Sequence, residues 1–125
     1  MAEVLIVDDE PDTREVLGKI LERAGHVVRI ARDGKEAVTQ VNLKPPDVVV
    51  LDLLMPTMNG ADFLATVRAY RRFRSLPIVL LTAVSDHPLL DQVVELGVQS
   101  ILVKSKAIFE DIRRAIEEAM RAKAP

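Results

Sequence analysis

Carboxylate, hydroxyl and ammonium side chains follow short apolar segments that lie far apart in this sequence. They are Asp8, Asp9 and Glu10 after the first segment, Asp52 after the third, Thr82 after the fourth and Lys104 after the fifth. Crowded carboxylates repel one another, and a hard divalent cation relieves that repulsion. Oxygen ligands without His or Cys favour Mg2+, or Mn2+, over zinc or copper. Because Mg2+ shares its coordination with phosphate, these residue types indicate a site for a divalent cation and a phosphoryl group.

Asp52 is the candidate nucleophile, because it stands alone at the end of a central apolar segment. A carboxylate can attack phosphorus and form an acyl phosphate, and the transfer depends mainly on positioning and charge neutralisation. The Lys104 ammonium group would neutralise phosphoryl oxygens, and the Thr82 hydroxyl could donate a hydrogen bond to them. Backbone N–H groups could complete the cradle, namely those of Leu53, Leu54 and Ala83.

Five short apolar segments alternate with longer amphipathic stretches. The segments are residues 4–7, 27–30, 48–51, 78–81 and 101–103. The central segments hardly alternate in polarity, which is typical of parallel strands buried on both faces. Arg29 interrupts the second segment and indicates an edge strand.

Apolar residues recur at helical spacing between these segments. We expect a helix from Pro11 that stops at Gly25, others around residues 37–41 and 63–70, one around 89–94 that stops at Gly97, and one around 108–119. Strand and helix thus alternate throughout, which predicts a doubly wound α/β domain with right-handed crossovers. Such sheets bind ligands at the carboxyl ends of their strands, where the polar residues above would gather.

The composition bounds the function further. A chain of 125 residues with 49% hydrophobic residues suits one domain, residues 1–125. The chain has no cysteine, which excludes disulfides and thiolate metal sites and fits a cytoplasmic location. No apolar run approaches the length of a membrane span, roughly 18–20 residues. We expect no direct binding of nucleic acid, because the net charge is −2 and the aromatic content is only 3%.

With these residues in view, the chain resembles bacterial two-component response regulator receiver domains over almost its whole length. The resemblance is carried by Val7-Asp8-Asp9-Glu10, Asp52-Leu53-Leu54-Met55-Pro56 followed by Asn59-Gly60, Leu81-Thr82-Ala83, Gly97 and Lys104. Each motif alone is weak evidence for the family. Together they are strong evidence, because they occur in the order of the family and the polar motifs follow the expected strands. The resemblance implies a flavodoxin-like (βα)5 three-layer sandwich with a parallel five-stranded sheet in the order 2-1-3-4-5.

The resemblance also implies the roles of the site residues. Asp52 would be the phosphoacceptor, with a histidine kinase or histidine phosphotransfer protein as donor. Asp9 would bind the metal directly and Asp8 through water, with Asp52 and the backbone carbonyl of Leu54 as further ligands. Thr82 and Lys104 would sense the bound phosphoryl group.

The same resemblance implies a signalling module rather than an enzyme. Its output would be docking of a downstream protein on the face of the fourth helix, fifth strand and fifth helix. A second copy of the chain is a further candidate partner. Nothing after the fifth helix is long enough to form an effector domain, so we expect either a stand-alone regulator or a piece of a longer protein.

Two residues depart from the family pattern. The family has proline after the lysine, usually with a cis peptide bond, whereas Ser105 follows Lys104 here. A cis bond without proline costs about 2.5–4 kcal/mol, so we predict a trans bond. The switch aromatic of the last strand falls on Ile101, which has no ring to rotate. This departure motivates an alternative, a docking module that works without phosphorylation.

Other interpretations of these residues are weaker. A phosphatase resembling the haloacid dehalogenase family would need a second Asp two residues after the nucleophile, where Leu54 stands, and no G-x-G-x-x-G or Walker loop follows the first strand. Leu54 and Val84 are apolar and cannot position a hydrolytic water, which predicts a long-lived phosphoryl state. A cluster of arginines is best explained as cations at the end of the third helix, namely Arg68, Arg71, Arg72 and Arg74.

Overall fold

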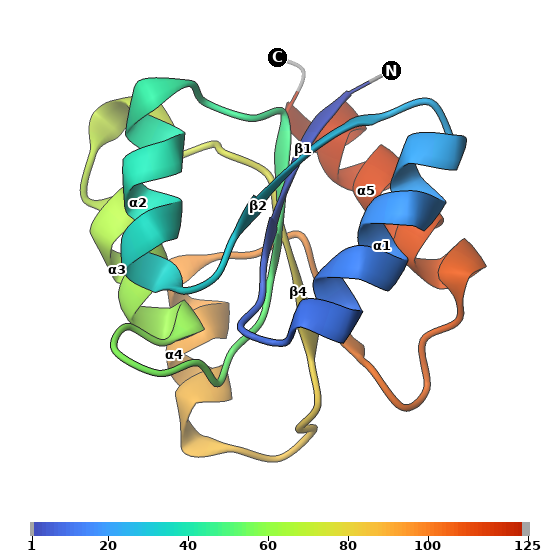
Figure 1. Cartoon of the computed structure of the whole chain (residues 1–125). Helices are drawn as coiled ribbons and strands as arrows, with labels where there is room; N and C mark the ends of the chain where they lie inside the picture. The colour runs from blue at the N-terminus through green and yellow to red at the C-terminus, as the bar shows by residue number, and fades with distance from the viewer. Residues whose placement is uncertain (1, 124–125) are drawn as a thin grey trace.

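The computed structural model describes residues 2–123, in which strands and helices alternate along the chain (Figure 1). The strands are β1 (Glu3–Val7), β2 (Val27–Ala31), β3 (Val48–Leu51), β4 (Ile78–Thr82) and β5 (Ser100–Val103). The helices are α1 (Pro11–Arg23), α2 (Gly34–Leu43), α3 (Gly60–Arg68), α4 (Pro88–Leu96) and α5 (Phe109–Lys123), with a short 3-10 turn, η1, at Arg71–Phe73.

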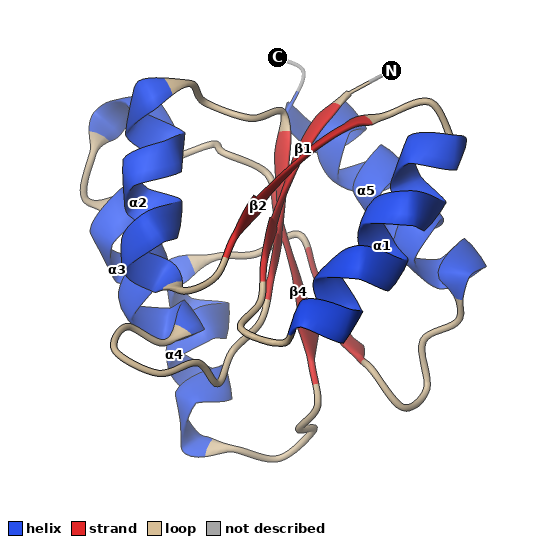
Figure 2. Cartoon of the chain, in the orientation of Figure 1, coloured by secondary structure: helices blue, strands red, loops and turns tan. Residues whose placement is uncertain are grey.

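The strands form one parallel sheet in the order β2-β1-β3-β4-β5. Figure 2 shows this sheet as the middle layer, with α2, α3 and α4 on one face and α1 and α5 on the other. The doubly wound α/β fold and the strand order predicted from the sequence are therefore confirmed. The strand that carries Arg29 lies at an edge, as its sequence indicated, because β2 pairs only with β1.

The sheet separates two hydrophobic cores. Val49 and Leu51 of β3 belong to the core beneath α2, α3 and α4, whereas Val48 and Val50 belong to the core beneath α1 and α5. This division follows from the alternation of side chains along a strand, and it explains why the β3 segment is apolar at every position. Each fully buried Val or Leu side chain contributes roughly 1.5–3 kcal/mol, so the central strands hold the frame of the site in place.

Several helix ends follow the sequence signals. Pro11 stands in the first turn of α1, and Gly25 and Gly97 adopt φ values of 94° and 98° just after α1 and α4. These backbone angles favour glycine because it has no Cβ. The Asn59 side chain caps α3 by accepting a hydrogen bond of 2.9 Å from the Asp62 N–H. The site loops are thus bounded by fixed helix ends.

Three expected boundaries were wrong. Thr82 does not follow β4 but is its last residue, because it pairs with Val103 of β5. The third helix ends at Arg68 rather than near Tyr70, since the chain tightens there into η1. Ile108 lies before α5, where its N–H donates to the Asp111 side chain. No peptide bond is cis among the described residues, so the predicted trans bond between Lys104 and Ser105 is confirmed.

Candidate functional site

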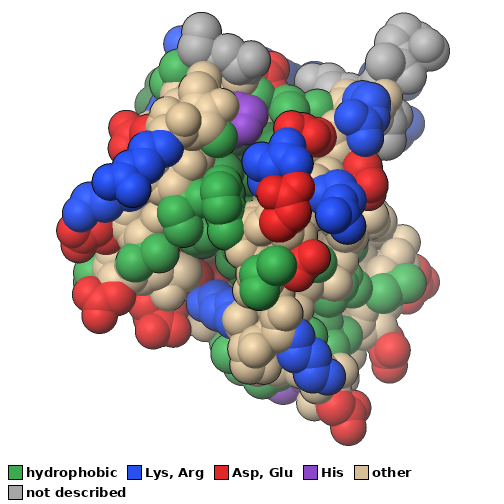
Figure 3. Space-filling model, turned by 90° about the vertical axis from the view of Figure 1, so that its right-hand side faces the viewer, with side chains coloured by type: hydrophobic (Ala, Val, Ile, Leu, Met, Phe, Trp, Pro, Cys, Tyr) green, Lys and Arg blue, Asp and Glu red, His purple; other side chains and the backbone are tan. Residues whose placement is uncertain are grey.

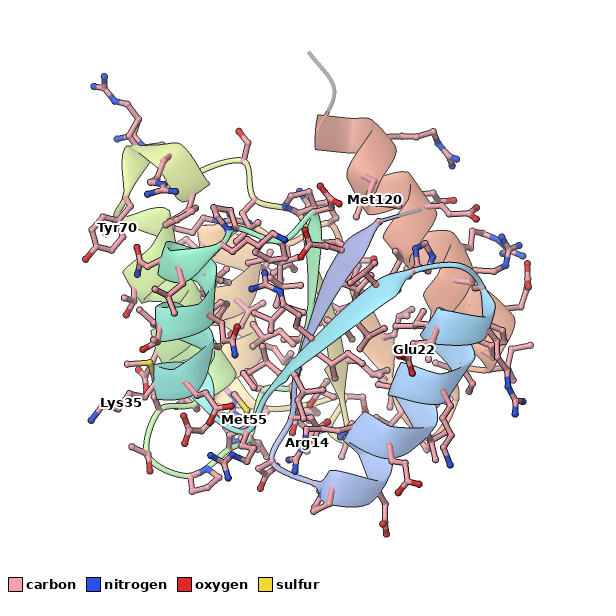
Figure 4. The ribbon with its side chains drawn as sticks, turned by 45° about the horizontal axis from the view of Figure 1, so that its top comes forward. Arg14, Glu22, Lys35, Met55, Tyr70 and Met120 are labelled. Atoms are coloured by element: carbon pink, nitrogen blue, oxygen red, sulfur yellow. The ribbon has the colours of Figure 1, made fainter. Side chains whose placement is uncertain are left out.

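The polar residues identified in the sequence lie at the carboxyl edge of the sheet. Arg14 of α1 and Met55 of the β3–α3 loop, both labelled in Figure 4, mark this edge. Asp8 follows β1 and Asp52 follows β3, and the two strands are neighbours. The Asp52 N–H donates to the Val7 carbonyl at 2.9 Å, which extends the pairing of these strands up to the site.

Lys104 joins the acidic residues of two separate segments, the loops after β1 and after β3. Its Nζ atom donates to Asp8 Oδ2 at 2.8 Å and lies 3.8 Å from both Asp52 Oδ2 and Glu10 Oε1. The Lys104 backbone N–H donates to the Thr82 carbonyl at 2.8 Å, so β4 fixes the root of this side chain. Residues separated by up to 96 positions in the chain therefore meet in one cluster of charged side chains.

The carboxyl group of Asp52 is deeply buried, with 5% of the residue exposed. Burial and the negative charge of Asp8 raise its pKa from the ordinary value of 3.8 to about 6, against the opposing effects of Lys104 and the Leu53 N–H. The desolvated carboxylate is thus poorly compensated, and a cation bound beside it would stabilise its ionised form. Burial lowers the pKa of Lys104, but its hydrogen bond to Asp8 and the negative charges of Asp52, Asp8 and Glu10 outweigh this effect and raise the pKa overall.

The acidic loop supplies ligands suited to a divalent cation. Carboxylate oxygens of Asp8, Asp9 and Glu10 lie within 4.8 Å of one another. Asp8 is buried, Asp9 is half-buried and Glu10 is exposed, so the cluster opens to solvent on one side. An all-oxygen donor set of this kind fits Mg2+ or Mn2+, and it fits neither zinc nor copper well.

The groups that we expect to bind phosphoryl oxygens differ in burial and in their contacts. The Leu53 N–H donates to Asp52 Oδ1 at 2.9 Å. Leu54, in the β3–α3 loop, and Ala83, directly after β4, are exposed at the mouth of the site. The Thr82 side chain is fully buried, and its Oγ1 accepts a bond of 3.3 Å from the Val84 N–H.

Sequence reasoning missed the structural role of Gly60. Its N–H donates to the Leu53 carbonyl at 2.8 Å, and a Cβ added there would lie 2.4 Å from the Asp52 carbonyl oxygen. In the sequence, Asn59-Gly60 stands out only as part of the motif that follows Asp52. The glycine lets the start of α3 pack directly against the backbone of Asp52 and Leu53, and only the tertiary contact reveals this requirement.

The face formed by α1 and α5 carries a hollow next to the site. Figure 3 shows hydrophobic side chains lying among charged ones on this face. A hollow of about 310 Å³ is lined chiefly by apolar residues and reaches Lys104; its lining includes Val16, Leu17, Leu81, Ala107 and Ile112.

Among residues 2–123, no helix combines the length and the apolarity that a bilayer crossing requires.

Comparisons with known proteins agree with this fold and this arrangement of residues. The model of the response regulator receiver domain family matches residues 4–117, so the chain belongs to this family. The chain is 37% identical over 118 residues to the transcriptional regulatory protein PdtaR of Mycobacterium tuberculosis, covering 94% of this chain and 56% of that protein. It spans 35–62% of the length of four curated relatives, PdtaR included.

Solved structures show the same architecture. The signal receiver domain of a signal transduction histidine kinase from Syntrophus aciditrophicus superposes with a TM-score of 0.89 at 30% identity, covering 98% of this chain and 92% of that one. The Mn2+-bound form of the response regulator Rcp1 has a TM-score of 0.79 at 22% identity, covering 94% of this chain and 91% of that one. At that identity, the second likeness concerns the fold alone.

Proposed function

We propose that residues 1–125 form a receiver domain that accepts a phosphoryl group on Asp52 from a sensor histidine kinase or a histidine phosphotransfer protein. One observation carries the proposal: the buried Asp52 carboxyl group lies 3.8 Å from the Lys104 ammonium group, which also binds the acidic loop through Asp8. A carboxylate held between a fixed cation and a cluster of metal-binding oxygens can serve as a phosphoryl acceptor.

The metal would lie between the acidic loop and the phosphoacceptor. Asp8, Asp9 and Asp52 and the Leu54 carbonyl would hold Mg2+ or Mn2+, which supplies charge neutralisation for the incoming phosphoryl group. The Lys104 ammonium group and the Thr82 hydroxyl would bind phosphoryl oxygens. Backbone N–H groups would bind the remaining oxygens, namely those of Leu53, Leu54 and Ala83. Such a protein acts as a signalling module and not as an enzyme.

Exposed apolar residues support docking as the output. Val94 of α4 is 63% exposed, Ile101 of β5 is 36% exposed and Phe109 of α5 is 37% exposed. Exposed apolar side chains of this size are typical of protein interaction sites when they form a patch. We propose that a downstream protein, or a second copy of the chain, binds the α4-β5-α5 face in a way that depends on phosphorylation.

Mass spectrometry tests the proposal directly. Incubation with acetyl phosphate and Mg2+ should add the mass of one phosphoryl group, because the buried carboxylate attacks the activated phosphorus. Asp52→Ala should abolish the gain, whereas Asp91→Ala, which removes an exposed carboxylate from α4, should leave it unchanged. Absence of the mass gain in the unmodified protein, or its persistence in Asp52→Ala, would contradict the assignment.

Ile101 favours one alternative function. Because this side chain is exposed on β5 and has no ring to rotate, the domain would dock its partner without a phosphorylation switch. In that case, partner binding would be the same for the unmodified protein and for Asp52→Ala. Binding that strengthens with acetyl phosphate treatment would exclude this alternative.

A further inference from the structure

The backbone carbonyl of Asp8 lies just beyond the end of β1, at the point where the neighbouring strand β2 also ends. The Asp8 N–H still donates to the Ala31 carbonyl at 3.1 Å, but Ala31 is the last residue of β2. Among the described residues, the sheet supplies no donor to the Asp8 carbonyl beyond this point. Because only 2% of Asp8 is exposed, its carbonyl oxygen needs a partner within the protein.

Within residues 2–123, no backbone N–H donates to this oxygen. The Glu10 N–H is used by Asp8 Oδ1 at 2.9 Å, and Pro11 has no N–H to donate. Arg14 Nη1 instead donates to the Asp8 carbonyl at 2.8 Å, and it is the only donor to that oxygen within residues 2–123. Arg14 itself is held in the first turns of α1, where its N–H donates to the Glu10 carbonyl at 3.1 Å.

We propose that Arg14 is a positioning residue that holds the acidic loop, residues 8–10, in the conformation that binds the metal. This inference rests on the proposed function, since it assigns to that loop the metal needed for phosphoryl transfer. The Arg14 side chain connects the end of β1 to α1 across the loop, next to the carboxyl edge of the sheet (Figure 4). Together with the Lys104 bond to Asp8 Oδ2, it fixes Asp8 through both its backbone and its carboxyl group.

A role of Arg14 as a charge and a role as a positioning residue predict opposite changes in Mg2+ affinity when its side chain is removed. If Arg14 acted only as a positive charge near the acidic loop, its loss would make the loop more negative and Mg2+ would bind more tightly. If it positions the loop, its loss would free residues 8–10 in the metal-free protein, and Mg2+ would bind less tightly because binding would have to order them. The sign of the change therefore separates the two roles.

The test uses Arg14→Met, which removes the charge and the donor but keeps an unbranched side chain. Titration calorimetry with MgCl2 should show affinity lowered about tenfold, equivalent to about 1.4 kcal/mol. Hydrogen exchange of the metal-free protein should be faster at the Asp9 and Glu10 amides. At saturating Mg2+, acetyl phosphate should label the variant to the same final extent as the unmodified protein.

The matched control is Lys19→Met, which removes an equal charge from the exposed side of the same helix. It should change neither the Mg2+ affinity nor the exchange of the loop. Unchanged or tighter Mg2+ binding by Arg14→Met, or unchanged loop exchange, would overturn the inference. If Arg14→Met does not fold, Arg14→Ala, which also removes the charge and the donor, carries the same test. Failure of the unmodified protein to bind Mg2+ would instead refute the proposed function, while the exchange measurement would still decide the role of Arg14.

Discussion

Replacing Asp52 with its neutral isostere, Asn, should stabilise the metal-free protein. In Asp52→Asn the buried negative charge disappears, while the amide oxygen can still accept the Leu53 N–H bond that Asp52 Oδ1 accepts at 2.9 Å. The pKa of Asp52 is raised from 3.8 to about 6, chiefly by burial and by the charge of Asp8. Since each tenfold change in proton affinity is worth about 1.4 kcal/mol, ionised Asp52 costs the folded state on the order of 3 kcal/mol above its folded pKa.

The sign and the pH window follow from this raised pKa. The folded state binds the Asp52 proton more tightly than the unfolded state does, so this group destabilises the fold as pH rises from 3.8 to about 6. Above that window the penalty is complete, and below it the penalty is absent. Asp52→Asn should therefore raise the free energy of unfolding by about 2–3 kcal/mol near pH 8, and the gain should vanish near pH 4.

Urea denaturation followed by circular dichroism, in buffers containing EDTA, measures the free energy of unfolding near pH 8 and near pH 4. Asp91→Asn is the control, because it removes an exposed carboxylate of α4 and should change little at either pH. Added Mg2+ should stabilise the unmodified protein more than Asp52→Asn, since the metal compensates the charge that the variant lacks. The reasoning is refuted if Asp52→Asn gains nothing near pH 8, or if its gain is the same at both pH values.

Three further predictions concern the surroundings of the pocket. Lys104→Met should lower the metal-free stability by about 1–3 kcal/mol in thermal denaturation, because it leaves the buried carboxylates unpaired. Lys106→Met, which removes an exposed lysine nearby, should leave the stability unchanged. Gly60→Ala should cost about 1–3 kcal/mol in urea denaturation, since its Cβ would lie 2.4 Å from a backbone oxygen, and an unchanged midpoint would contradict the close contact. Gly18→Ala should stabilise the protein by about 0.5–1 kcal/mol in the same assay, because alanine is a better helix former and its Cβ would meet only Val28, at 3.9 Å. A loss of stability would show that the space between Gly18 and Val28 cannot hold a methyl group.

The sequence by itself determined the architecture. Near-continuous apolar segments separated by amphipathic stretches specify a parallel sheet covered on both faces, and Arg29 in one segment identifies the edge strand, because a charged side chain is tolerated only where one side of the strand meets solvent. The motifs at the strand ends identified the family, and the family model confirms that assignment. The roles of Asp52, Thr82 and Lys104 in phosphoryl transfer stay predictions.

Only the tertiary structure decided the partners of each group. The order of residues in the chain does not show that Lys104 binds Asp8 more closely than Asp52, that Gly60 must be small because of the Asp52 carbonyl, or that Arg14 supplies the donor that Pro11 lacks. The first of these contacts joins side chains that lie far apart in the sequence, and the other two place Gly60 and Arg14 against backbone carbonyl oxygens. Periodicity reports which face of an element is buried, whereas hydrogen-bond partners depend on distances that exist only once the strands and helices have packed.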